Sequence, residues 1–221
     1  ITINGKKMGK SYNNVITLTQ LFSGDHPLLS KPFSPMTIRF FILQTHYRSV
    51  LDFSSEALEA AEKGLKRLFE AYNHLRDFSF ETTEGASDID LDGRVNRQLD
   101  ELSGFLDDDF NTARVLANLF EIVPVINSIK DHIIKQDALS ASTYQKLKEY
   151  FHRYIEEILG LKDEWEVTEA FKGVMDLMIS IRKEARSRKD FYTSDKIRNE
   201  LKKLGIEMKD EKGGEMSWRL G

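Results

Sequence analysis

The sequence predicts a mainly α-helical protein, with an antiparallel helical bundle followed by a small C-terminal unit made of a helix and a β-hairpin. Only 4 of the 221 residues are proline, and long stretches are rich in Ala, Leu, Glu and Lys, which favour helix. Apolar residues recur at helical spacing through most of the chain up to Ala185. After Gly205 the pattern changes to the alternation that is typical of strands.

The first helical segments have clear start signals. Ser34 and Pro35 are typical of an N-cap and a first helical residue. Residues 52–55 have the composition of the N-terminal end of a second helix, and a clear helical pattern follows them. We therefore expect helices within residues 34–76, after an N-terminal segment of residues 1–33. The apolar positions of these helices are Met36, Phe40, Phe41, Leu43, Tyr47, Leu58, Ala61, Leu65, Leu68, Phe69, Tyr72 and Leu75.

Helical spacing is absent from residue 78 to residue 93, so residues 77–93 are expected to form a flexible acidic loop. The spacing resumes at Val95, and a bundle is expected over residues 94–165. Its second helix should be capped by Asn111 and Thr112, run from Ala113 to about Ile134 and be kinked at Pro124.

The next helix is expected to begin at Ser140 or Ser142 and to end at Gly160. Its apolar face is formed by Tyr144, Leu147, Phe151, Tyr154, Ile155 and Ile158.

Residues 166–221 are expected to contain a last bundle helix and then the small C-terminal unit. The apolar face of that helix is Phe171, Val174, Met175, Met178, Ile179 and Ala185. A short helix from Tyr192 to Leu204 should stop at Gly205, and two strands should flank a turn at residues 211–214. Trp218 is expected to anchor the core of this unit.

Charge is unevenly distributed along the chain, although the net charge is only −4. Residues 77–111 contain 11 acidic and 2 basic residues, whereas residues 182–203 contain 9 basic and 4 acidic residues. A basic C-terminal patch of this kind is typical of surfaces that meet phosphate backbones, and a solvated helical face is the alternative. Phe191 lies among Arg186, Arg188 and Lys189, a pattern that suits stacking of an RNA base beside phosphate contacts.

Several functional classes are excluded or disfavoured. The chain has no cysteine, which rules out disulfides and thiolate metal sites and fits a cytosolic protein. The five histidines are scattered, so no metal site is expected, and the carboxylates of residues 107–109 have no His or Lys partner nearby in sequence. The sequence predicts no membrane span and no signal peptide. Its strand-like start without an initiator Met suggests a fragment.

Residues 5–11 form a short loop with three lysines and two glycines, Gly-Lys-Lys-Met-Gly-Lys-Ser. Glycine lets backbone N–H groups approach an anion closely, and lysine supplies a mobile charge. The spacing is not that of a P-loop. By spacing alone the segment is either an anion-binding loop of another kind or a solvated basic turn.

This loop and several later blocks resemble the cysteinyl-tRNA synthetase family. Residues 7–11 resemble the KMSKS signature of class I aminoacyl-tRNA synthetases, with Gly9 in place of its first serine and Tyr12-Asn13-Asn14 in place of the usual Leu-Gly-Asn. The other similar blocks, in family order, are residues 36–49 with 51–54, residues 108–113, residues 186–195, residues 205–210 and Trp218-Arg219.

The resemblance implies a C-terminal part of an enzyme that joins cysteine to tRNA-Cys using ATP with Mg. In this part, residues 1–33 would be the tail of the catalytic domain, residues 34–76 connecting helices and residues 94–165 a DALR-type anticodon-binding bundle. The resemblance further implies ATP phosphate binding by Lys10, Lys7, Gly9 and Ser11, with Lys10 and Lys7 as the catalytic residues. The Rossmann core and the zinc-binding cysteine pocket of the family would lie upstream, so their ligands are not expected here. The fragment alone is expected to be inactive and monomeric.

The resemblance also implies that anticodon bases are read by Arg186, Asp195 and Asp210, with Phe191 where a stacking tryptophan is often found and Trp218 in the same unit. Two alternatives remain open at this point. The chain could be a free-standing tRNA- or RNA-binding module without catalytic activity, or a relative that joins cysteine to a small amine without tRNA.

Overall fold

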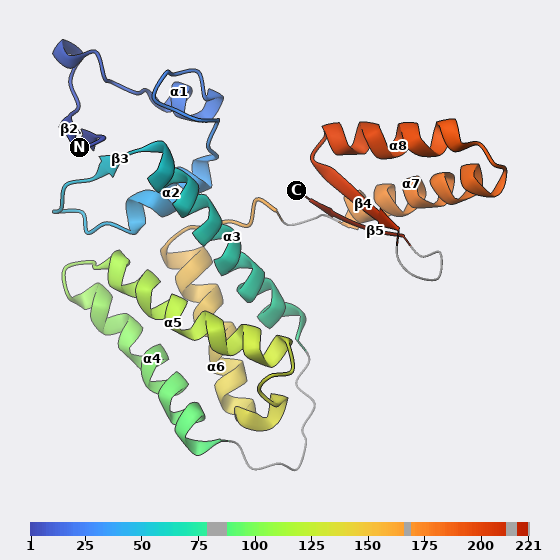
Figure 1. The fold of residues 1–221 in the computed structure, drawn as a ribbon. Coiled ribbons are helices and arrows are strands. Elements are labelled where there is room, and N and C mark those ends of the chain that lie inside the picture. The colour runs from blue at the N-terminus through green and yellow to red at the C-terminus, as the bar shows by residue number, and fades with distance from the viewer. Residues whose placement is uncertain (79–87, 166–168, 211–215, 221) are drawn as a thin grey trace. The chain divides into compact units, whose positions relative to one another are not determined.

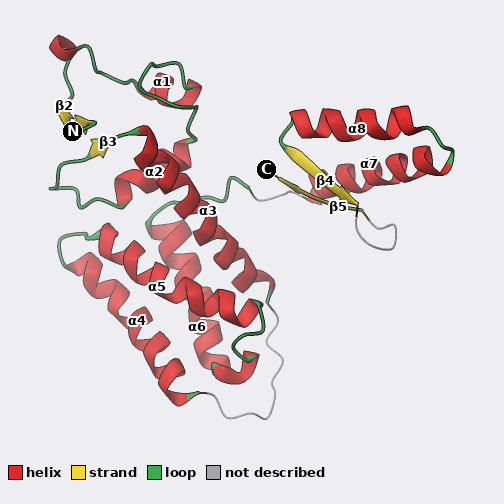
Figure 2. Ribbon diagram, in the orientation of Figure 1, coloured by secondary structure: helices red, strands yellow, loops and turns green. Residues whose placement is uncertain are grey.

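The computed structural model describes residues 1–78, 88–165, 169–210 and 216–220. The chain forms two compact units, Ile1–Asp163 and Glu164–Gly221, which are described one at a time. Helices account for most of both units (Figures 1 and 2), as the sequence predicts. The central part of the expected acidic loop, residues 79–87, and the expected hairpin turn lie outside the described residues.

The first unit begins with a small sheet that brings the N-terminus against a segment after the second helix. Strands β1 (Thr2–Ile3) and β2 (Lys6–Lys7) are antiparallel, and β1 pairs in parallel with β3 (Asp52–Phe53). A 3-10 turn, η1 (Lys10–Tyr12), and the short helix α1 (Leu18–Ser23) follow β2. The three-strand order β2-β1-β3 therefore attaches the lysine loop to residues 50 positions away.

Two helices with the predicted caps follow. Helix α2 (Pro35–Leu43) begins after Ser34, whose hydroxyl accepts the N–H of Thr37 at 3.0 Å. Helix α3 (Ser55–Asp77) begins after Ser54, whose hydroxyl accepts the N–H of Ala57 at 3.1 Å. Both starts are confirmed, because a cap is a local interaction that the sequence specifies directly.

Helix α4 (Ile89–Asp107) begins earlier than the sequence predicts. The Asp88 carboxylate accepts the N–H groups of Asp90 and Leu91, each at 3.1 Å, and the side chain of Leu91 is buried. Residues 89–93, assigned to the flexible loop, are therefore helical. The acidic composition that suggested a loop is instead that of a helical first turn, where carboxylates favour the N-terminal end of the dipole.

Helix α5 (Thr112–Lys130) is capped by Asn111 as predicted, but it ends at Lys130, before Ile134. Pro124 lies inside it; the predicted kink remains a prediction. By length and composition this one described helix is apolar enough to cross a membrane, which the sequence does not predict. Half of the apolar stretch is buried in the bundle, and a core helix has the same composition.

The 3-10 turn η2 (Gln136–Ala138) leads to helix α6 (Ala141–His152), which is capped by Ser140. The helix continues as a π-helical turn, η3 (Arg153–Ile158). The wider turn rotates later residues away from the expected face, so Ile158 is 40% exposed and Leu159 is buried in its place. The prediction that Ile158 lines the core is therefore wrong.

The second unit contains α7 (Glu169–Ser187), α8 (Phe191–Lys203) and a hairpin of β4 (Ile206–Asp210) and β5 (Met216–Leu220), visible in Figure 1. Met175, Leu201 and Ile206 form its buried core, and Trp218 packs against them. The structure therefore groups α7 with this unit and corrects its assignment as a last bundle helix. The predicted face of α7 is also partly wrong, since Val174 is 55% exposed.

Candidate functional site

The lysine loop begins with a tight hairpin turn. Asn4 and Gly5 both have positive φ values, 50° and 74°, which is the combination that a two-residue turn with the twist of a β-hairpin requires. Lys6 and Lys7 follow as the exposed strand β2. The turn thus fixes the position at which these two ammonium-bearing side chains leave the sheet.

Asp52 holds this turn from the neighbouring strand. Its Oδ1 atom accepts the hydroxyl of Thr2 at 2.5 Å and the backbone N–H of Gly5 at 2.9 Å. Both hydrogen bonds favour the ionised carboxylate, and they lower the pKa of Asp52, with the Thr2 hydroxyl as the larger cause. The sequence predicts only a helix cap at residues 52–55, and no local signal indicates this second role of Asp52.

The amide of Asn14 closes the other half of the loop. It accepts the N–H of Gly9 at 2.9 Å and donates to the carbonyl of Lys7 at 3.0 Å. Lys10 and Ser11 lie in the 3-10 turn and are exposed. Gly9 has an extended conformation, with φ of −175°, which any residue can adopt.

A pocket of about 660 Å³ lies beside the hairpin. The residues that line it are Ile3, Asn4, Lys6, Lys7, Tyr12, Asn13, Asn14 and Leu28. Of the predicted phosphate-binding residues, the structure brings Lys7 to this pocket, while Lys10, Gly9 and Ser11 are not among its lining residues. Lys6, which was not predicted, lines it beside Lys7. Within the described part of the chain, neither Lys7 nor Lys10 has an ion-pair partner.

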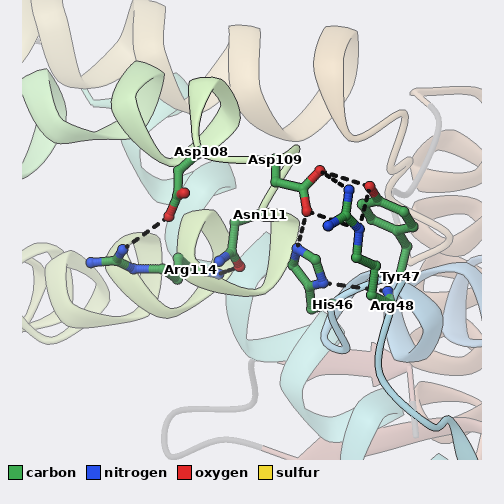
Figure 3. Close-up of polar contacts among 7 residues, drawn as sticks. All are labelled: His46, Tyr47, Arg48, Asp108, Asp109, Asn111 and Arg114. Atoms are coloured by element: carbon green, nitrogen blue, oxygen red, sulfur yellow. Dashed lines mark hydrogen bonds and ion pairs between the residues drawn. The ribbon is translucent and has the colours of Figure 1, made fainter.

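A polar cluster around Asp109 lies at the corner between α4 and α5 (Figure 3). Its Oδ1 atom accepts the Tyr47 hydroxyl at 2.7 Å and Nη2 of Arg48 at 3.2 Å. Its Oδ2 atom lies 3.2 Å from Nε of Arg48 and 3.6 Å from Nε2 of His46. The hydrogen bond to the carboxylate is the largest cause that raises the pKa of Tyr47.

The neighbouring carboxylate pairs differently. Asp108 lies 3.5 Å from Nη1 of Arg114, whose guanidinium sits 4.5 Å from the ring centroid of Phe105. Asp108 and Asp109 of this run therefore both have partners in the structure, an arginine close in sequence for Asp108 and residues from a distant segment for Asp109. Because Tyr47 and Asp109 are 62 residues apart, no local signal reveals the contact.

In the second unit the predicted RNA-binding residues differ from one another in exposure and in partners. Arg186 is exposed in the last turn of α7, and Phe191, at the first position of α8, is 62% exposed. Asp195 pairs with Arg198 at 3.4 Å. Asp210 ends β4, opposite Met216.

Trp218 is half-buried, with its ring 5.6 Å from that of Phe171. Its core packing makes it the anchor that the sequence predicts.

A second pocket, of about 320 Å³, lies between α8 and β4. Its lining is mainly polar and basic, and consists of Arg198, Asn199, Lys202, Glu207, Met208 and Lys209. The sequence predicts the basic patch but not this hollow, because the hollow forms only where α8 packs on β4.

The residues present do not fit a zinc site. The chain has no cysteine, and among the described residues no group of three or more His, Asp or Glu side chains could hold a metal ion. The zinc site that the resemblance implies therefore has no ligand set in this part of the chain.

Comparison with known proteins gives matches to family models in the first unit and to relatives over the whole chain. Residues 1–63 match the family model "tRNA synthetases class I (C) catalytic domain", and residues 104–162 match the "DALR domain" model. Over the whole chain, the sequence is 49% identical to the cysteine–tRNA ligase of Parabacteroides distasonis and 46% identical to that of Bacteroides fragilis, and it covers 43% of each relative. It is 38% identical to the cysteine–tRNA ligase of Chlorobaculum tepidum over 97% of this chain and 42% of the relative.

The chain spans less than half the length of these curated relatives. The catalytic match extends to residue 63, so it includes α2 and the start of α3, beyond the expected tail at residues 1–33. The DALR match covers the end of α4, all of α5 and α6 and the π-helical turn. The chain therefore belongs to the cysteine–tRNA ligase family, as a part that comprises the end of the class I catalytic domain and the DALR domain.

Proposed function

We propose that this chain supplies two parts of an enzyme that attaches cysteine to tRNA-Cys using ATP: the loop that binds the ATP phosphates and the region that binds the anticodon. The observation that carries this proposal is the match to cysteine–tRNA ligases over the whole chain, with a lysine-bearing hairpin at one end. The whole enzyme would be cytoplasmic and monomeric, with ATP, Mg, cysteine and tRNA-Cys as its substrates and partners.

In the lysine loop, Lys7 and Lys10 would bind the phosphates and stabilise the negative charge that develops as pyrophosphate leaves. Both side chains are exposed and have no ion-pair partner within the described residues. No ion pair with an acidic residue therefore has to break before either lysine binds a phosphate. The N–H of Gly9 is already bonded to Asn14. Gly9 would therefore contribute loop mobility rather than a free backbone donor, and Ser11 would offer its hydroxyl.

In the second unit, Phe191 would stack on a splayed anticodon base, because its ring is exposed at a helix start next to basic residues. Asp195 and Asp210 would accept from base edges, and Arg186 would contact the backbone or a base. Both side chains of the Asp195–Arg198 ion pair are exposed, so the pair contributes little stability and can be replaced by a contact with RNA. Trp218 would support the hairpin that carries Asp210.

Triphosphate binding tests the loop assignment. We expect Lys7→Ala and Lys10→Ala each to weaken binding of inorganic triphosphate to the chain by roughly three- to tenfold, since each removes one charge-assisted contact. Lys63→Ala, which removes an exposed lysine of α3, is the matched control and should leave binding unchanged. Equal losses in all three variants would mean that only net charge matters, and would contradict the assignment.

The chain by itself is proposed to be unable to form cysteinyl-adenylate. A measurement of ATP–pyrophosphate exchange with cysteine decides this, and exchange above background by the purified chain would refute it.

A further inference from the structure

The Asp109 cluster joins two parts of the first unit that match different family models. Asp109 lies in the range matched by the DALR domain, and its partners at residues 46–48 lie in the range matched by the catalytic domain. A second link runs beside it, from the hydroxyl of Thr112 to the carbonyl of Leu43 at 2.8 Å. The end of α2 is thus held by the start of α5.

The segment held by Asp109 has little else to fix it. The side chains of Tyr47, Arg48, Ser49 and Val50 are all exposed, so burial contributes little to their order. The turn has its own hydrogen bond, from the N–H of Ser49 to the carbonyl of His46 at 2.8 Å. Its placement against the bundle depends on the polar contacts to the carboxylate.

The same segment continues directly into the strand that carries the lysine hairpin. The carbonyl of Leu51 accepts the N–H of Thr2 at 2.9 Å, and that of Phe53 accepts the N–H of Asn4 at 3.0 Å. Asp52 then binds Thr2 and Gly5, immediately before the two lysines of β2. Only three residues separate Arg48, which binds Asp109, from Asp52, whose side chain binds the lysine-bearing hairpin.

Asp109 is itself held in a demanding conformation. Asp109 and Phe110 have φ values of 58° and 52°, a region that is unfavourable for most side chains and persists only when the surroundings enforce it. The N–H of Phe110 donates to Leu106 at 2.9 Å and that of Asn111 to Phe105 at 3.0 Å. The helix corner therefore presents the carboxylate from a fixed backbone.

From these contacts we propose that Asp109 is a positioning residue for the lysine loop. It fixes the turn at residues 46–48, and through β3 this turn sets the place and order of the β1–β2 hairpin. Asp109 does not contact the lysine loop itself; it acts on the loop through residues 46–48 and β3. The consequence for phosphate binding rests on the function proposed above, whereas the coupling itself does not.

Hydrogen exchange on the whole chain tests the coupling. We expect Asp109→Asn, which tolerates the same backbone conformation, to speed exchange in peptides covering residues 1–9 and 46–53 by about two- to tenfold. Peptides from α6 serve as the internal reference and should not change. The matched control is Asp108→Asn, which removes the neighbouring charge but only its pair with Arg114, and it should leave the hairpin unaffected.

Tyr47→Phe approaches the same contact from the other side without changing charge. It should speed exchange in the same peptides, but by a smaller factor. In the double variant with Asp109→Asn, Tyr47→Phe should speed exchange less than it does alone, because both substitutions remove the same hydrogen bond. Faster exchange at residues 46–53 with no change at residues 1–9 would overturn the proposal. So would equal acceleration in α6, which would indicate general destabilisation.

Triphosphate affinity of the same variants separates the two proposals. A several-fold weaker affinity in Asp109→Asn but not in Asp108→Asn would support both. Faster hairpin exchange with unchanged affinity would support the positioning role and contradict the assignment of the loop to phosphate.

Discussion

Arg39 donates its Nε–H to the carbonyl of Leu159 at 2.7 Å, and so ties helix α2 to the end of the π-helical turn. The following residue, Gly160, has φ of 61° and packs so closely that a β-carbon there would lie 2.7 Å from Nη2 of Arg39. A left-handed backbone turn, the absence of a side chain at Gly160 and a guanidinium hydrogen bond thus meet where the regions matched by the two family models contact each other.

Gly160→Ala should therefore destabilise the first unit. We expect the free energy of unfolding to fall by about 1–3 kcal/mol, from the left-handed conformation and from displacement of Arg39. Gly93→Ala is the matched control, because Gly93 lies in helix α4 with open space around it, and it should stabilise by roughly 0.5–1 kcal/mol. Urea denaturation followed by far-UV circular dichroism measures both, and equal effects would contradict the argument.

The β1–β2 hairpin should depend on pH through Asp52. Its pKa is lowered in the folded protein, so its contribution is present above the unfolded pKa, about 3.9, and is lost as pH falls through the folded value. We expect the amide resonance of Gly5 to report a transition below the ordinary aspartate range. Thr2→Val, which removes the larger cause, should move the transition toward higher pH; a transition that does not move would contradict the assignment.

Gly9→Ser restores the serine of the KMSKS signature and should be tolerated. The backbone at Gly9 is extended, and the new β-carbon would meet Cδ2 of Tyr12 at 3.2 Å, a ring that is exposed and can move. We expect the free energy of unfolding to change by less than about 0.5 kcal/mol. Triphosphate affinity should be equal or higher, because a hydroxyl is added beside the lysines. A weaker affinity would show that glycine is needed for loop mobility.

Anticodon reading and backbone binding should separate in the second unit. Asp210→Ala should reduce discrimination between tRNA-Cys and a tRNA with a changed anticodon more than it reduces overall affinity. Lys202→Ala, in the basic hollow between α8 and β4, should weaken binding of both tRNAs and reduce the salt dependence. Filter binding at several salt concentrations measures both effects. The same loss for both tRNAs in both variants would contradict base reading by Asp210.

Local signals in the sequence predicted the helix starts well. Ser34, Ser54, Asn111 and Ser140 each accept a backbone N–H within their own first turn, so nothing beyond neighbouring residues is needed to place them. Helix α4 starts earlier than the sequence predicts because acidic residues are common both in loops and in first helical turns, and the Asp88 cap and the burial of Leu91 distinguish the two.

Departures from a regular period account for the other differences. Ile158 fits a helical face by spacing, but the π-helical turn before it rotates it outward. Helix α7 has the amphipathic pattern of a bundle helix, yet its Met175 packs on Leu201 and Ile206. An apolar face shows that a helix packs on something, and it does not say on which partner.

The helical class, the helix caps, the terminal hairpin, the lysine loop and the family can all be predicted from the sequence, because each depends on residues close together or on blocks in order. Which side chains meet across the chain depends instead on the tertiary fold. It placed Asp52 on the lysine hairpin and Asp109 on residues 46–48, and it brought Lys6 rather than Lys10 beside Lys7 at the pocket. The contacts of Asp52 with Gly5 and of Asp109 with Tyr47 join residues that are 47 and 62 positions apart, and pairings over such distances depend on the tertiary fold and leave no local pattern.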